Sequence, residues 1–84
     1  MLSHKQQLLI LQIYKQPFGI YMTEQKIYNN QRAFYRAVKA LEEHEFIEKV
    51  YIPIINKTRI TLCLKGELVA FAVSPMLGSD LNGI

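Results

Sequence analysis

The sequence predicts a small α+β domain in which a charged helix leads directly into a β-hairpin. Three features carry this prediction: one amphipathic helical segment, one pair of strand-like segments, and an apolar helical segment near each end. With 84 residues the chain has room for one domain with one small core. We expect a folded domain over residues 1–76 and a flexible C-terminal tail over residues 77–84, where glycine and polar residues are frequent.

The terminal segments are more apolar than one small domain requires. A helix is expected over residues 3 to about 16, and its apolar residues between positions 8 and 14 would occupy more than one face. The segment from residue 68 to 73 repeats this pattern. The simplest explanation is a symmetric homodimer joined through the terminal helices; the alternative is that both helices lie wholly inside one core. The expected interface residues are Leu8, Leu9, Ile13, Leu68, Phe71 and Ala72.

Between these ends the pattern predicts two helices separated by a tight turn. Thr23 is a suitable cap for a helix of one or two turns over residues 24–28, and Asn29-Asn30 is a turn signal. A longer helix is then expected over residues 31–44. Its apolar residues recur every three or four positions and form one stripe: Phe34, Ala37, Val38 and Leu41.

The other stripe of this helix carries charge of one sign. It contains Arg32, Tyr35, Arg36 and Lys39, and no acid precedes Glu42. Opposite charges four residues apart would stabilise a helix by roughly a few tenths of a kcal/mol, and that gain is forgone here. Cations near a helix N-terminus also oppose the helix dipole. A polyanionic partner would explain the arrangement, and the alternative is a solvated face with chance segregation of charge.

The charged helix is followed by two strand-like segments. Residues 46–55 are rich in Ile, Val, Tyr and Phe, Asn56-Lys57 could form the turn, and residues 58–64 alternate polar and apolar. Pro53 would interrupt the hydrogen-bond ladder and suits an edge or a bulge. Ile54 and Ile55 either pack under the hairpin or contact a partner protein or second subunit.

Two segments resemble the winged helix-turn-helix transcription regulators of the MarR/PadR type. In that family the recognition helix runs into a hydrophobic strand through a leucine, a charged run, a glycine and an apolar pair, and residues 41–47 read LEEHEFI. Residues 62–67, LCLKGE, are similar to the family's junction between wing and final helix. The order of helix, short helix, charged helix, hairpin and apolar helix extends the resemblance over nearly the whole chain.

The chain departs from the family pattern at two positions. Glu45 stands where the family usually has glycine, and a left-handed residue with a Cβ costs about 1 kcal/mol or more. Either that strain is tolerated or the turn differs. Cys63 stands where threonine would normally cap the last helix, and a thiol is a weaker acceptor than a hydroxyl.

The resemblance implies a winged helix-turn-helix with a three-helix core, a two-stranded β-hairpin wing and a C-terminal apolar helix. It implies sequence-specific binding of double-stranded DNA by a small homodimeric transcriptional regulator. Residues 31–44 would enter the major groove, and residues 46–64 would reach the backbone or minor groove. A dimer would present two such helices about one helical turn apart, so an inverted-repeat site is expected.

The side chains suit these roles. Arg32 and Arg36 could each read guanine, Gln31 could read adenine, and Tyr35 could contact a thymine methyl or a phosphate. The other candidate contacts are Lys39 on the same stripe, Lys26, Tyr28, Asn29 and Asn30 at the turn, and Lys57 and Arg59 at or beside the hairpin tip. The net charge of +3 and the pI near 9.1 agree with a nucleic-acid partner without requiring one.

Other classes of function have little support in the sequence. The two histidines, His4 and His44, lie far apart, and neither a CxxC nor an HxxxH pair exists, so we expect no enzyme, no metal and no cofactor. No apolar run reaches the ~20 residues of a membrane span. A cytoplasmic location is expected, in the host cell if the chain is viral or plasmid-borne. The main alternative function is a winged-helix adaptor that binds other proteins and no DNA.

Overall fold

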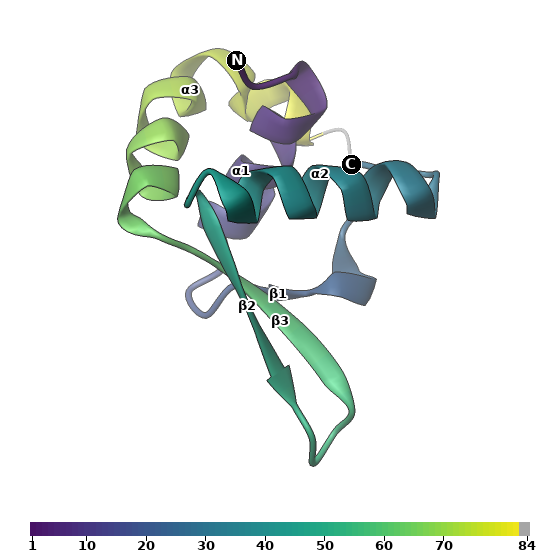
Figure 1. Cartoon of the computed structure of the whole chain (residues 1–84). Helices are drawn as coiled ribbons and strands as arrows, with labels where there is room; N and C mark the ends of the chain where they lie inside the picture. Colours follow the sequence, from purple (N-terminus) through teal and green to yellow (C-terminus); the bar gives the residue numbers. More distant parts are fainter. Residues whose placement is uncertain (83–84) are drawn as a thin grey trace.

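The computed structural model describes residues 1–82, which form three α-helices and one three-stranded antiparallel sheet (Figure 1). The elements are α1 (His4–Tyr14), β1 (Ile20–Tyr21), the 3₁₀ turn η1 (Met22–Glu24), α2 (Gln31–Glu43), β2 (Ile47–Ile52), β3 (Lys57–Leu62) and α3 (Leu64–Asn82). The expectation of an α+β domain is therefore confirmed. In Figure 1 the helices form one body, and the β2–β3 hairpin extends away from it.

Helix α1 lies at the centre of the core. Leu9, Ile10 and Leu11 have an exposed fraction of 0% because α3 and β3 pack against α1 and the apolar stripe of α2 joins the same core. Burying a side chain of this size contributes about 1.5–3 kcal/mol. Leu8 and Ile13 are likewise buried. The assignment of Leu8, Leu9 and Ile13 to a dimer interface is wrong, because the core of a single chain already covers them.

The sheet contains a strand that the sequence pattern does not reveal. The two-residue strand β1 pairs with β3, Ile20 opposite Ile60 and Tyr21 opposite Arg59, so the strand order is β1-β3-β2. Two residues are too few to show a period-two pattern. β1 ties the loop after α1 to the base of the hairpin.

The short second helix expected over residues 24–28 is wrong. Only the 3₁₀ turn η1 forms, and Thr23 lies inside it instead of capping it. The Glu24 carboxylate accepts a hydrogen bond from the Tyr21 N–H at 2.7 Å, and the Gln25 side-chain oxygen accepts from the N–H groups of Ile27 and Tyr28. These side chains satisfy the backbone donors that a helix would otherwise use, so the segment can remain extended.

The hairpin turn also differs from the expectation. β2 ends at Ile52 and β3 begins at Lys57, so the turn occupies residues 53–56 and not Asn56-Lys57. Pro53 has no N–H to donate to the ladder, and the Asn56 N–H donates to the Pro53 carbonyl oxygen at 3.2 Å. Asn56 has a φ of 52°, the left-handed conformation that asparagine tolerates well. Ile54 and Ile55 consequently lie in the turn.

Helix α2 has the expected position. It begins at Gln31, where the Asn30 side-chain oxygen accepts a hydrogen bond from the Ala33 N–H at 3.1 Å. It ends before Glu45, which has a φ of 64°, and the Phe46 N–H donates to the Leu41 carbonyl oxygen at 2.9 Å. Glu45 thus adopts the left-handed conformation for which the family uses glycine, and the strain is tolerated.

Helix α3 is longer than expected. It continues to Asn82, so the helix does not end near residue 76, and the predicted tail is wrong over residues 77–82; residues 83–84 lie outside the described part. Pro75 lies inside the helix with its side chain exposed, while Leu77 and Leu81 pack against the core. Burial of these leucines favours continuation of the helix despite the missing N–H of Pro75. No helix in residues 1–82 is both long and apolar enough to cross a membrane.

Candidate nucleic-acid interface

The exposed face of α2 brings the five candidate recognition residues together. The buried face carries Phe34, Ala37, Val38 and Leu41, and the opposite face presents exposed Gln31, Arg32, Tyr35, Arg36 and Lys39. The Gln31 amide Nε2 donates to the Tyr35 hydroxyl at 3.2 Å, and Tyr35 is 50% exposed. The predicted stripe is therefore one continuous polar surface on a rigid helix.

The cations of this face carry uncompensated charge. Within residues 1–82, none of Arg32, Arg36 and Lys39 forms an ion pair. The acid nearest to them in sequence, Glu42, instead lies 3.4 Å from Lys49 of β2. Three free cations on two turns of helix produce a positive potential that attracts a polyanion.

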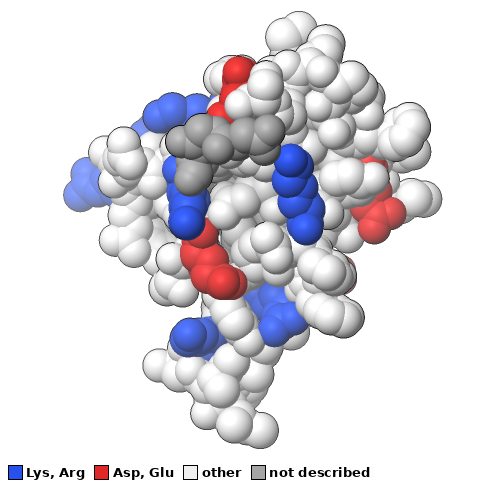
Figure 2. Space-filling view, turned by 180° about the vertical axis from the view of Figure 1, so that it is seen from behind, with Lys and Arg blue, Asp and Glu red and all other residues white. Residues whose placement is uncertain are grey.

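Charge on the opposite side of the molecule is mixed. Figure 2 views the molecule from behind α2, and there Lys and Arg side chains alternate with acidic ones over the helical body. The end of the hairpin carries neither colour. Charge on this side is therefore mixed, whereas residues 31–41 of α2 contain cations and no acid.

The residues at the turn before α2 divide into two groups. Lys26 and Asn29 are exposed and can reach a ligand. Tyr28 is half-buried, with its ring 6.1 Å from that of Phe34, and burial raises the pKa of its hydroxyl. The side-chain oxygen of Asn30 is used by the helix cap, so only its amide nitrogen remains to donate outward.

The two candidate cations of the hairpin have different environments. Lys57 is exposed at the start of β3, next to the hairpin turn, and its Nζ lies 5.0 Å from the centre of the Tyr21 ring. Arg59 lies inside β3, paired with Val50 and Tyr21, two residues farther from the hairpin turn than Lys57. Its guanidinium donates to the Phe18 carbonyl oxygen at 3.1 Å and the Tyr21 hydroxyl at 2.8 Å.

Arg59 is better described as a structural residue. Its guanidinium lies 4.8 Å from the centre of the Tyr21 ring, within cation–π range, and its Nε is buried without a hydrogen-bond partner. These contacts fasten the loop before β1 to the sheet. Sequence reasoning missed this role because it depends on β1, which the pattern does not show.

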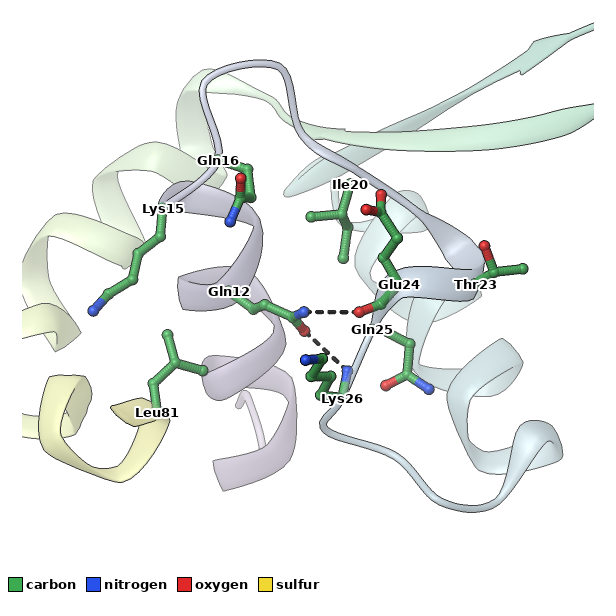
Figure 3. Close-up of a pocket in the computed structure, with 9 residues that line it drawn as sticks. All are labelled: Gln12, Lys15, Gln16, Ile20, Thr23, Glu24, Gln25, Lys26 and Leu81. Carbon is green, nitrogen blue, oxygen red and sulfur yellow. Dashed lines mark hydrogen bonds between the residues drawn. The ribbon is translucent and has the colours of Figure 1, made fainter. Parts of the chain in front are cut away.

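A groove beside α1 has polar walls but no arrangement typical of catalysis. It has a volume of about 530 Å³, and Figure 3 shows its lining residues: Gln12, Lys15, Gln16, Ile20, Thr23, Glu24, Gln25, Lys26 and Leu81. Gln12 spans it, donating to the Glu24 carbonyl oxygen at 3.1 Å and accepting from the Lys26 N–H at 3.2 Å. Both bonds hold the η1 segment against α1, which explains a polar residue between the buried Leu11 and Ile13.

The other reactive side chains are not grouped into a site. In the described part of the chain, no three His, Cys, Asp or Glu residues lie together as a metal site would need. Burial, together with the negative charges of Glu48 and Glu45, raises the pKa of the Cys63 thiol. The thiol is therefore mostly protonated at neutral pH and a weak nucleophile.

Searches of protein-family models, curated proteins and solved structures found no match to this chain.

Proposed function

We propose that this chain is a small winged helix-turn-helix protein that binds double-stranded DNA through the exposed face of α2. The observation that carries the proposal is the set of three unpaired cations, Arg32, Arg36 and Lys39, on the face of α2 that points away from the core. The order of the elements supports the fold assignment, with the helix before α2 reduced to the turn η1.

The geometry suits an α-helix entering the major groove. Arg32 and Arg36 follow one another by one helical turn, so their guanidinium groups can address neighbouring base pairs, and each can donate two hydrogen bonds to a guanine. Gln31 and Tyr35 already share a hydrogen bond and would contact a base edge or a phosphate as a pair. Lys57 at the hairpin and Lys26 before α2 would bind phosphates on either side.

The salt dependence of binding tests this proposal. Fluorescence anisotropy on a random-sequence duplex is expected to show an affinity whose logarithm falls linearly with the logarithm of the salt concentration, with a slope of about −0.9 for each phosphate neutralised. The expected size of this slope follows from the five cations Arg32, Arg36, Lys39, Lys57 and Lys26. Absence of binding at low salt, or binding that salt does not weaken, would refute DNA binding through this face.

We also propose that the protein acts as a homodimer joined through α3. Leu64, Leu68, Phe71 and Met76 lie on one side of α3 with exposed fractions of 73%, 63%, 74% and 68%, and Ala72 is exposed beside them. In an antiparallel pair of α3 helices centred between residues 71 and 72, each Phe71 would face Ala72 of the second copy. A large residue would thus meet a small one. The two-fold axis repeats this contact, so the two surfaces complement each other.

A matched pair of substitutions tests the dimer. Phe71→Asp is expected to convert a particle of dimer mass into one of monomer mass in light scattering, because a buried carboxylate in that contact would lack a partner. Phe18→Asp, at a position equally exposed in the single chain (75% against 74%), is expected to leave the dimer mass unchanged. A monomeric wild-type protein, or equal effects of the two substitutions, would contradict the α3 interface.

One observation favours a second function, a protein-binding adaptor. The hairpin turn exposes apolar side chains, with Ile54 at 95% and Ile55 at 45%, so these residues do not pack under the hairpin. An adaptor would use this surface for a partner protein, and its binding would depend little on salt. The salt titration therefore separates the two functions.

A further inference from the structure

The end of the hairpin is an apolar projection on an otherwise cationic element. The charged residues of the hairpin are Lys49, Lys57, Arg59 and one acid, Glu48 at the base of β2. The exposed apolar side chains at its end are Tyr51, Ile54 and Ile55, at 55%, 95% and 45%. We define the hairpin tip as residues 53–56. A wing that only touched phosphates would need cations at the tip, where this chain has Pro53, Ile54 and Ile55.

The tip is held in one conformation. Pro53 has a fixed φ, the Asn56 N–H bonds to the Pro53 carbonyl oxygen at 3.2 Å, and the Tyr51 hydroxyl donates to the side-chain oxygen of Asn56. Six paired residues on each strand, about 17–20 Å in length, carry this turn away from the helical body (Figure 1). A rigid, narrow projection can enter a gap that a broad apolar surface cannot.

We propose that the hairpin tip is a wedge that inserts Ile54 between adjacent base pairs of the bound duplex and bends the DNA. This inference rests on the proposed function, because α2 must first hold the DNA. Apolar side chains such as Ile and Pro unstack a base step when they enter from the minor groove, and the duplex kinks away from them. Lys57, directly after the tip, supplies charge complementary to a flanking phosphate.

The duplex is the occupant that the charges favour. The hairpin carries three basic residues and one acid, Glu48 at its base, so its net charge is positive and complements a polyanion, and the three free cations of α2 already address one. A single fully exposed isoleucine fits the gap between two base pairs, whereas a protein partner would need a wider apolar area to bind stably. The easily kinked pyrimidine–purine steps TA and CA are the expected sites of insertion.

The experiment compares wild-type protein with Ile54→Ala on three duplexes derived from one base sequence. The first carries a fluorophore at each end to report bending by energy transfer, the second carries 2-aminopurine at a central TA step, and the third has a two-base bulge at that step. The wild type is expected to bend the first duplex by about 20–90° and to increase the 2-aminopurine fluorescence. It should bind the bulged duplex roughly tenfold or more tightly than the intact one, because the bulge removes the cost of unstacking.

Ile54→Ala is expected to lose the bend, the fluorescence increase and the preference for the bulge, while Ile54→Leu retains them. Phe18→Ala, which removes an exposed ring outside the hairpin (75% exposed), should behave as the wild type. Ile54 is 95% exposed, so its replacement leaves the core intact.

Four results would overturn the wedge. Wild-type protein that binds the duplex without bending it would refute the wedge and leave the proposed function standing, as would an equal bend with Ile54→Ala. Wild-type protein that binds no duplex would refute both proposals together. Binding to vesicles of phosphatidylserine and phosphatidylcholine that depends on Ile54, with unbent DNA, would assign the tip to a membrane surface instead.

Discussion

Replacing both Arg32 and Arg36 with alanine is expected to weaken DNA binding by two orders of magnitude or more. Each guanidinium that contacts a guanine through two hydrogen bonds contributes about 1–3 kcal/mol of discrimination, and each also contributes charge. Both side chains are exposed and lie opposite the buried stripe of α2. The fold should therefore persist, with an unchanged helical circular dichroism spectrum and an unchanged midpoint of unfolding.

The control for this double variant removes the same charge elsewhere. Lys5 and Lys15 lie at the two ends of α1 and are both exposed, so replacing both with alanine also lowers the net charge by two. This control is expected to weaken DNA binding by less than about tenfold, because it changes only the long-range electrostatic field of the protein. Equal losses of DNA affinity in the two double variants would show that binding depends on the total charge and not on the α2 face.

Gly66→Ala is expected to cause a large loss of stability by adding a single methyl group. A Cβ at position 66 would lie 2.1 Å from the Phe46 carbonyl oxygen and 3.1 Å from the Phe46 carbonyl carbon. This backbone is held by the Cys63 N–H, which donates to the same Phe46 oxygen at 3.0 Å, so it cannot move aside freely. Overpacking of this kind costs about 1–3 kcal/mol or more in the free energy of unfolding.

Gly78→Ala, in the same helix, is expected to increase the free energy of unfolding. A Cβ there meets nothing within 4 Å, and alanine is a better helix former than glycine by about 1 kcal/mol. Denaturant unfolding of both variants measures the difference. A Gly66→Ala protein as stable as the wild type would contradict the close approach of α3 to the backbone just before β2.

The parts of the fold that the sequence predicted are those with a long, regular pattern. The apolar stripe of α2 recurs over residues 34–41, and the helix lies where it was expected, with its outward side chains on one face. In the sequence, Gly66 is only part of a family-like motif. The structure gives a physical reason for glycine at this position, because a Cβ would collide with the Phe46 carbonyl oxygen. The motif therefore reflects packing at the junction of the hairpin with α3.

The parts that could not be predicted depend on contacts between distant residues. β1 exists because Ile20 meets Ile60, 40 positions away, and Arg59 turns inward because β1 brings Tyr21 to it. The segment over residues 24–28, expected to be a helix, instead forms backbone hydrogen bonds with the side chains of Gln12 and Gln25. Propensity for a short helix is weak, and side-chain amides override it.

The extent of α3 was mispredicted for a related reason. Pro75 and Gly78 are local signals for the end of a helix, but Val73, Leu77 and Leu81 lie along one side of α3 and pack toward the core. The free energy gained by burying this side of α3 exceeds the cost of the hydrogen bond that Pro75 cannot donate. The opposite side then becomes the exposed apolar surface that we assign to a second copy of the chain.

The most direct test of the α2 interface is a titration of ¹⁵N-labelled protein with a random-sequence duplex, followed through backbone amide chemical shifts. We expect the largest shifts at residues 31, 32, 35, 36 and 39 of α2, with further shifts in the hairpin and little change along the buried helix α1. Shifts confined to α3, or a spectrum that the duplex does not change, would contradict DNA binding through α2.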